Sequence, residues 1–321
     1  MSKQKKEKKG LLNDIMSKSS LTKSKEKKMR DSKEEKNKLN DLLKGLTPEK
    51  IKKISNKHMR DVHSLTPAQV ERLVRGKKVP RKKSLKFEEP KKEFKFGIVT
   101  DTHLCSTLCK LDELKEFYKI MEKEGVTEVL HAGDMVAGNG KMFRGQLSEM
   151  TCYGFDQQAE EVINEFPSIP GVTTHAIAGN HDLSFFNDNG ADLMQTVADS
   201  RDDINYLGHY EAMINLHGVK IKLLHPERGS GYAITYKSQR MVEQMEEKNK
   251  PDIFILGHWH TSCYFNQCDV HVIHGGCWEG QGAYLVRKGI WPSIGGWIVT
   301  VKTNGKGKLL SVQPEFYTFN A

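Results

Sequence analysis

The chain lacks long apolar runs: no stretch of about 18 uncharged apolar residues occurs in it, so we expect no membrane-spanning helix. Its first ten residues, MSKQKKEKKG, are charged and are not followed by the apolar segment that a secretory signal contains. Cysteine is scarce, with six residues in 321. We therefore expect a cytoplasmic protein whose cysteines are mostly reduced thiols or metal ligands.

Negative charge is scarce in the N-terminal part of the chain. Residues 1–93 contain 30 Lys and Arg against 13 Asp and Glu, a net charge of +17, whereas residues 94–321 contain 20 against 28, a net charge of −8. Positive charge concentrated in this way favours a polyanionic partner, and we expect residues 1–93 to bind nucleic acid. No membrane partner is expected, and the oligomeric state stays open, with a dimer as one alternative.

Composition divides the N-terminal part into two segments. Residues 1–45 are rich in Lys, Glu, Ser and Asn and carry little apolar surface, which predicts a lysine-rich disordered tail. Residues 46–93 are interpreted as a short basic helical segment and a linker, because LTPEKIKKI (46–54) and LTPAQVERL (65–73) each place Thr and Pro where a helix begins. A helix-turn-helix and a solvated helical hairpin are both compatible with this pattern.

From residue 94 to residue 321, strand and helix patterns alternate, which is typical of an α/β domain. The expected strands span residues 94–100, 126–133, 171–179, 253–257 and 270–276, with hairpins in 210–227 and 295–319. The expected helices span residues 110–125, 155–166 and 238–248.

Polar side chains of metal-binding type follow five of these strands. They are, in chain order, Asp101 and His103, then Asp134, then Asn180, His181 and Asp182, then His225, and finally His258 and His260. Ligands of α/β sheets bind beyond the carboxyl ends of the strands, so we expect these side chains to converge. Carboxylates, an amide oxygen and imidazoles together suit two divalent ions such as Mn, Fe or Zn.

The ordered blocks Asp-x-His, Gly-Asp, Gly-Asn-His-Asp, His and Gly-His-x-His resemble those of the calcineurin-like metallophosphoesterase superfamily. The resemblance covers about residues 94–320 and includes GDMVAG and GNHD, with Pro226 after His225 where many members have Gly. It implies a four-layer α/β/β/α sandwich and a metal-dependent phosphoric ester hydrolase.

The resemblance further implies a ligand set. Asp101, His103 and His260 would hold one ion, Asn180, His225 and His258 the other, and Asp134 would bridge the two. A shared carboxylate is also what two dications about 3.5–4 Å apart require. The expected cofactor is a pair of divalent ions, with Mn preferred and Fe, Zn, Ni or Mg as alternatives.

Two neighbouring residues are candidates for catalysis. A hydroxide bridging the ions would be the nucleophile, and His181 would stabilise the developing charge or protonate the leaving oxygen. Asp182 would orient His181 or a ligand. By contrast, His131, His175, His271 and His274 are interpreted as packed histidines.

Four cysteines lie near the expected ligands. Cys105 and Cys109 follow His103, and Cys263 and Cys268 follow His260. They are candidates for a structural zinc site, although the spacing within each pair is looser than usual and unpaired cysteines are the alternative.

The sequence predicts a phosphodiesterase or nuclease that acts on DNA or RNA. The first alternative is a phosphomonoesterase or nucleotide hydrolase with a basic tail that does not bind substrate. The second is a nucleic-acid-binding protein with a regulatory hydrolase body. The segment 280–297, which contains Arg287, Lys288 and two tryptophans, either lines a substrate groove or forms a packed surface loop.

Overall fold

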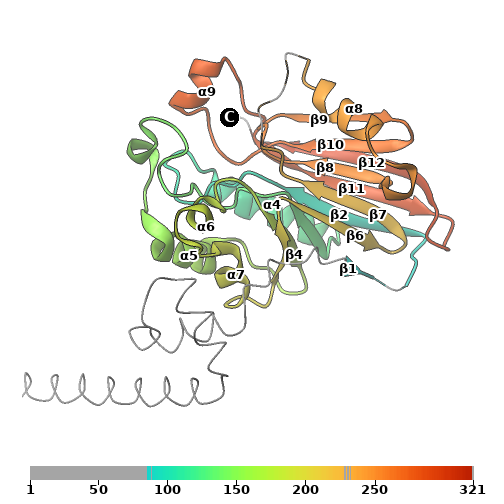
Figure 1. The fold of residues 1–321 in the computed structure, drawn as a ribbon. Coiled ribbons are helices and arrows are strands. Elements are labelled where there is room, and N and C mark those ends of the chain that lie inside the picture. The colour runs from blue at the N-terminus through green and yellow to red at the C-terminus, as the bar shows by residue number, and fades with distance from the viewer. Residues whose placement is uncertain (1–84, 88, 228, 230, 232, 320–321) are drawn as a thin grey trace, which may run out of the picture. The chain divides into compact units, whose positions relative to one another are not determined.

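The computed structural model describes residues 85–87, 89–227, 229, 231 and 233–319 (Figure 1). The tail interpreted at residues 1–45 and the helices and most of the linker interpreted at 46–93 lie outside these residues. None of the described helices combines the length and the apolar character needed to cross a bilayer.

The described chain forms two six-stranded sheets (Figure 1). The first contains, in spatial order, β12 (Leu309–Thr318), β11 (Gly295–Thr303), β2 (Glu93–Val99), β3 (Glu128–His131), β4 (Thr173–Ala178) and β5 (Ile204–His209). The second contains β1 (Leu85–Lys86), β6 (Glu211–Leu216), β7 (Val219–Leu224), β8 (Ile253–Leu256), β10 (Val270–Gly275) and β9 (Ser262–Gln267). Strands β2 to β5 are mutually parallel, as are β7, β8 and β10, so each sheet has a parallel centre.

Helices occupy the connections between the strands. They are α4 (Leu111–Lys123), α5 (Gly154–Glu165), α6 (Ser184–Asn189), α7 (Leu193–Ala198), α8 (Tyr236–Glu243) and α9 (Ala283–Lys288), with short 3₁₀ turns η2 (Gln146–Glu149) and η3 (Glu247–Asn249). In α4, Leu114, Phe117, Tyr118 and Met121 recur at helical spacing and are all buried, so one face of this helix packs on the sheet. Gly125, with φ 73°, ends this helix in the left-handed conformation that glycine tolerates.

Three layers of apolar contacts hold the domain together. Between the sheets, Ile98 and Leu130 of the first pack in one core with Ile221 and Ile255 of the second. Helices α4, α5 and α7 contribute to the core on the outer face of the first sheet, and α8 packs on the outer face of the second through Val242. The predicted four-layer α/β/β/α sandwich is therefore confirmed.

The second sheet has an edge strand that the sequence did not predict. Strand β1 pairs in parallel with β6, with Leu85 opposite Ile214, although it belongs to the segment interpreted as a linker. Phe87 follows it and packs against the inter-sheet core, with its ring 5.7 Å from the ring of His217. A two-residue strand carries no recognisable alternation of apolar and polar residues, so tertiary contacts alone define it.

We expect Leu130→Ala to lower the free energy of unfolding by roughly 2–5 kcal/mol, because a fully buried leucine side chain leaves a cavity between the sheets. The matched control is Leu310→Ala on β12, where the side chain is 64% exposed and the change should stay within about 0.5 kcal/mol. Equilibrium urea unfolding measures both. Equal losses would contradict the assignment of Leu130 to the inter-sheet core.

Candidate metal centre

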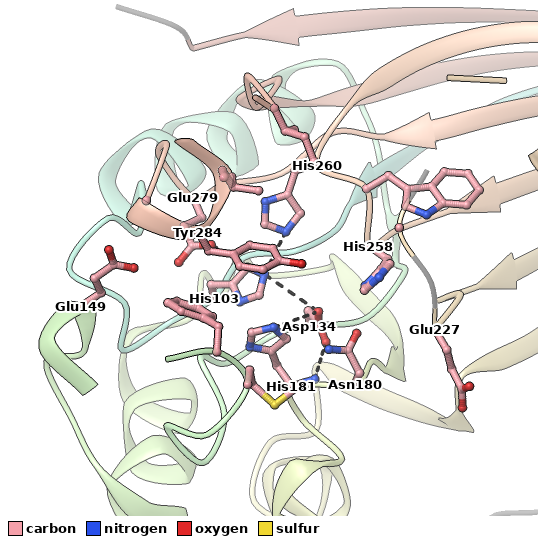
Figure 2. Close-up of a pocket in the computed structure, with 17 residues that line it drawn as sticks. His103, Asp134, Glu149, Asn180, His181, Glu227, His258, His260, Glu279 and Tyr284 are labelled. Carbon is pink, nitrogen blue, oxygen red and sulfur yellow. Dashed lines mark hydrogen bonds and ion pairs between the residues drawn. The ribbon is translucent and has the colours of Figure 1, made fainter. Parts of the chain in front are cut away.

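The residues predicted from the strand ends converge at one edge of the two sheets (Figure 2). Asp101 and His103 follow β2, Asp134 follows β3, Asn180 follows β4, His225 follows β7, and His258 and His260 follow β8. Because the strands that precede them are parallel within each sheet, their carboxyl ends meet at the same edge.

Asp101, His103 and His260 form the first cluster. Their ligand atoms all lie within 4.8 Å of one another. The Nε2 atoms of His103 and His260 are 3.2 Å apart, and Nε2 of His260 is 3.4 Å from Oδ1 of Asp101. The Asp101 carboxylate also accepts hydrogen bonds from the backbone N–H of His258, which ties the loop after β2 to the loop after β8.

The second cluster contains Asp134, His225 and His258, again within 4.8 Å. Nε2 of His225 lies 3.1 Å from Oδ2 of Asp134 and 3.0 Å from Oδ1 of Asn180. Nδ1 of His225 donates to the carbonyl of Ala132, which directs Nε2 toward the cluster. Oδ2 of Asp134 is also 4.0 Å from Nε2 of His103 (Figure 2), so this carboxylate of the second cluster is also close to the first.

The backbone at the centre adopts an unusual conformation. Half of the ten described non-glycine residues with positive φ belong to the predicted ligand set: Asp101 (52°), His103 (45°), Asp134 (56°), His258 (76°) and His260 (53°). Each such residue costs on the order of 1–3 kcal/mol and persists only where its surroundings impose it. Their concentration at one edge indicates a functional site rather than a packed loop.

Two glycines allow the loops of the centre to approach each other closely. At Gly133, with φ 95°, a Cβ atom would lie 2.6 Å from Nδ1 of His225 and 2.9 Å from the backbone nitrogen of Gly179. A Cβ atom at Gly179 would overlap the carboxylate of Asp134. The two strand-end loops can therefore pack together only because neither position carries a side chain.

The centre combines anionic carboxylates with a neutral imidazole. Burial alone would raise the pKa of Asp134, but the facing His225 imidazole holds it well below its usual range. Burial likewise opposes ionisation of Asp101, yet the hydrogen bond from His260 lowers its pKa to about 2. Burial lowers the pKa of His103 to about 4, so this ring is neutral at pH 7. Burial would also lower the pKa of His225 and His260, but Asp134 raises the pKa of His225 to about 9, and Cys277 and Asp101 raise that of His260 well above its usual range. These two imidazoles would therefore have to release a proton to bind a metal ion.

His181 faces the cavity with a fixed ring. Its Nδ1 donates to the carbonyl of Ala137 at 2.7 Å, and its Nε2 lies 4.0 Å from Oδ2 of Asp134. The backbone N–H of His181 donates to Oδ1 of Asp134 at 2.8 Å. Residue Ala137, rather than Asp182, therefore orients this imidazole.

Asp182 is buried, and its hydrogen bonds hold the backbone beside the candidate ligands Asp134 and Asn180, with none to the His181 ring. Of the two roles expected for it, orienting a ligand therefore stays a prediction and orienting His181 has no hydrogen bond to support it. Its Oδ1 accepts hydrogen bonds from the backbone N–H groups of Met135 and Val136, at 2.9 and 3.1 Å. Its Oδ2 accepts from the N–H of Gly179 at 2.8 Å. Asp182 thus joins the loop after β3 to the loop after β4. Burial, with a contribution from Asp134, raises its pKa to about 7.

The two clusters open into a cavity of about 290 Å³ (Figure 2). Besides candidate ligands and His181, its lining includes three carboxylates and three aromatic side chains that the sequence did not single out as site residues: Glu149, Glu227, Glu279, Phe143, Trp259 and Tyr284. Glu279 could have been suspected, since it comes soon after the parallel strand β10. Phe143 and Glu149 lie in an irregular connection that carries no periodic signal.

The segment 280–297 contributes to this cavity, although not through its tryptophans. Tyr284 and Leu285 of α9 line it together with Ile290. Trp297 is buried and donates to the carbonyl of His274.

The histidines interpreted as packed lie outside the cavity lining: His131 contacts Thr102, His175 contacts Glu128, His271 stacks on Tyr264, and His274 contacts Ser238.

The cysteines do not form the zinc site that their spacing suggested. Cys105 is joined by a disulfide to Cys152, with the Cα atoms 5.2 Å apart, so it cannot be one of four thiolate ligands. Cys109, Cys263 and Cys268 are free, and no metal-type cluster among the described residues contains a cysteine. The four-cysteine prediction is therefore wrong, because Cys105 pairs with a residue of the connection between β3 and α5.

Comparison with known proteins identifies one family. Residues 94–286 match the family model of the calcineurin-like phosphoesterase superfamily domain. Similar solved structures include an archaeal phosphodiesterase, with 17% identity, a TM-score of 0.40, and coverage of 70% of this chain and all of that one. Vps29 of Entamoeba histolytica in complex with zinc has 15% identity, a TM-score of 0.35, and coverage of 71% and 100%.

A predicted phosphoesterase of Streptococcus pneumoniae TIGR4 has 12% identity, a TM-score of 0.33, and coverage of 70% of this chain and 98% of that one. No curated protein matches the chain.

We expect the oxidised, denatured protein to titrate four thiols out of six cysteines, because one disulfide withdraws two of them. Peptide mapping without reductant should recover the Cys105 and Cys152 peptides as one linked species. The variant in which Cys109, Cys263 and Cys268 are all replaced by serine should retain its full content of divalent metal. Six titratable thiols would contradict the disulfide, and loss of metal in the triple variant would contradict the exclusion of these cysteines from the metal site.

Proposed function

Because the chain belongs to the calcineurin-like phosphoesterase superfamily, we propose that it is a dinuclear-metal-dependent phosphodiesterase that acts on DNA or RNA. The observation that carries the proposal is the position of the buried Asp134 carboxylate between two groups of imidazole nitrogens. An anionic group in this position suits two dications held close together.

The residues present fit two divalent ions. Asp101, His103 and His260 would hold one ion, Asn180, His225 and His258 would hold the other, and Asp134 would contact both. The fit rests on donor atoms that converge within 4.8 Å in each of the clusters Asp101–His103–His260 and Asp134–His225–His258, where all but His260 and His258 are buried. A mixture of imidazole and carboxylate donors suits Mn, Fe, Zn or Ni better than Mg, and we propose Mn.

A pair of bound divalent ions would supply an acidified water as nucleophile and would neutralise charge on the phosphoryl oxygens. The chain itself would supply His181, whose Nδ1 is engaged by Ala137 and whose Nε2 faces the cavity. His181 would therefore present a proton to the leaving oxygen or stabilise charge that develops there. Asp182 would act indirectly, by fixing the loops that carry Asp134 and Asn180.

Nucleic acid is proposed as the substrate because of the positive charge of residues 1–93, which lie outside the metal centre. Residues 1–93 carry a net charge of +17 and could neutralise several backbone phosphates. A phosphomonoester or nucleotide substrate is the alternative if this segment does not bind substrate. Digestion of single-stranded DNA, duplex DNA and RNA in the presence of Mn, compared with hydrolysis of aryl phosphodiesters and monoesters, distinguishes these substrates.

We expect Asp134→Asn to lose both bound metal and phosphodiesterase activity, because one carboxylate would serve two ions. We expect His181→Ala to keep its metal content and to lose roughly 10²- to 10⁴-fold in kcat. His271→Ala is the matched control, since this histidine stacks on Tyr264 outside the cavity lining. Metal analysis and steady-state kinetics give the readouts. If His181→Ala emptied the site while Asp134→Asn did not, the roles would be reversed.

A second prediction concerns the basic N-terminal part. Deletion of residues 1–79, which retains strand β1, should flatten the plot of log affinity against log salt by about 0.9 per lost phosphate contact on duplex DNA, or about 0.7 on single strands. Hydrolysis of a small phosphodiester should be unchanged, because the candidate ligands all follow β2. Equal affinities and salt slopes for both proteins would favour the small-substrate alternative.

A further inference from the structure

Two aromatic rings from separate segments form a pair at the wall of the cavity. Phe143, in the connection between β3 and η2, stacks on Tyr284 of α9 with ring centroids 5.3 Å apart and planes inclined by 27°. Both line the cavity together with His103 and His181 (Figure 2). Tyr284 is 40% exposed and Phe143 is half-buried, so solvent reaches the Tyr284 ring more than the Phe143 ring.

Hydrogen bonds hold the two segments in place. Oε1 of Glu149 accepts from the backbone N–H of Ala283 at 2.9 Å, which joins η2 to the start of α9. The side chain of Gln146 donates to the carbonyl of Ala137 at 2.7 Å and accepts from the N–H of Met142 at 2.9 Å. The ring pair therefore belongs to a pre-formed wall, and ordering it on binding would cost little.

Exposed cations accompany the rings. Arg144 is adjacent to Phe143, and Arg287 and Lys288 follow Tyr284 in α9. Nζ of Lys288 lies 5.7 Å from the centroid of the Tyr284 ring. Among the described residues, no carboxylate forms an ion pair with any of these three cations. Their charge is thus available to a partner.

The cavity interior has the opposite charge. The carboxylates of Glu149, Glu227 and Glu279 line it, and Oε2 of Glu279 lies 3.9 Å from Nε2 of His103. Additional phosphates inside the cavity would meet these carboxylates, whereas outside it Lys288, over the Tyr284 ring, and the exposed Arg144 and Arg287 offer positive charge. The distribution suits a chain that places one phosphate at the centre and its other phosphates outside.

Aromatic rings beside unpaired cations are typical of surfaces that bind single-stranded nucleic acid, where bases stack on the rings and cations follow the backbone. We propose that the Phe143–Tyr284 pair stacks against an unpaired base next to the phosphate at the centre, which makes single-stranded nucleic acid the substrate class. This inference rests on the proposed phosphodiesterase function. A base within a duplex is covered on both faces by its neighbours and could not stack on the pair without leaving the helix.

The test compares binding of two labelled single-stranded oligonucleotides of equal length, one with normal bases and one composed of abasic sites. Fluorescence anisotropy is measured with the full chain in EDTA, so that cleavage does not intervene. The variants are Phe143→Leu, Tyr284→Leu and their combination, because leucine preserves apolar volume without a ring. Tyr284→Phe keeps the ring, and Tyr236→Leu removes a 57% exposed tyrosine of α8 that does not line the cavity.

We expect the double leucine variant to bind the normal oligonucleotide roughly 5- to 150-fold more weakly per stacked base, with no change for the abasic one. Tyr284→Phe and Tyr236→Leu should bind like the unaltered protein. Equal weakening for both oligonucleotides, no weakening for either, or no binding of single strands by the unaltered protein would overturn the inference.

Turnover of a small phosphodiester with Mn separates this inference from the proposed function. The unaltered protein and Tyr236→Leu should have the same kcat on that substrate, because Tyr236 does not line the cavity. If the unaltered protein hydrolyses no phosphodiester, the proposed function fails, while the anisotropy comparison still decides whether the rings bind bases.

Discussion

The candidate centre depends on one buried carboxylate, Asp134, and on the cost of placing it there. The side chain is 1% exposed, and its backbone lies in the left-handed region. A buried carboxylate is costly unless charged or hydrogen-bonding partners surround it. His225 at 3.1 Å and the backbone N–H of His181 at 2.8 Å provide such partners, and Asp182 fixes the loop that follows. The loops after three strands are therefore arranged around one negative charge.

The layers of the fold could be predicted because their signals are local. The helical spacing of buried residues in α4 and the apolar run of β8 are visible in the sequence, and both elements lie where they were expected. Strands β1, β5 and β9 were not predicted. Strand β1 has two residues, and β9 alternates only between half-buried and exposed positions at the edge of its sheet. Strand β1 is defined by its pairing with β6, far away in sequence, and β9 by its pairing with β10 across a turn. A short window of sequence reveals neither pairing.

The convergence of the candidate ligands could also be predicted, because parallel strands bring their ends together whatever the loops do. Their roles as metal ligands stay a prediction. The sequence could not reveal which distant segments meet to form and brace the rest of the cavity wall. The Phe143–Tyr284 pair joins residues 141 positions apart, and the Cys105–Cys152 disulfide spans 47 positions. Asp182 was expected to orient His181 or a ligand. Its hydrogen bonds go to the backbone beside Asp134 and Asn180, whereas the His181 ring donates to Ala137.

The acidic lining of the cavity has a consequence for turnover. A phosphodiester carries one negative charge, and the phosphomonoester produced from it carries about 1.5 to 2 at neutral pH. Glu149, Glu227 and Glu279 would therefore repel the product more strongly than the substrate at distances well within the range of unscreened charge. For the proposed reaction, the same carboxylates that disfavour a second phosphate inside the cavity would shorten the residence of the product, so that the wall of the cavity favours release over rebinding.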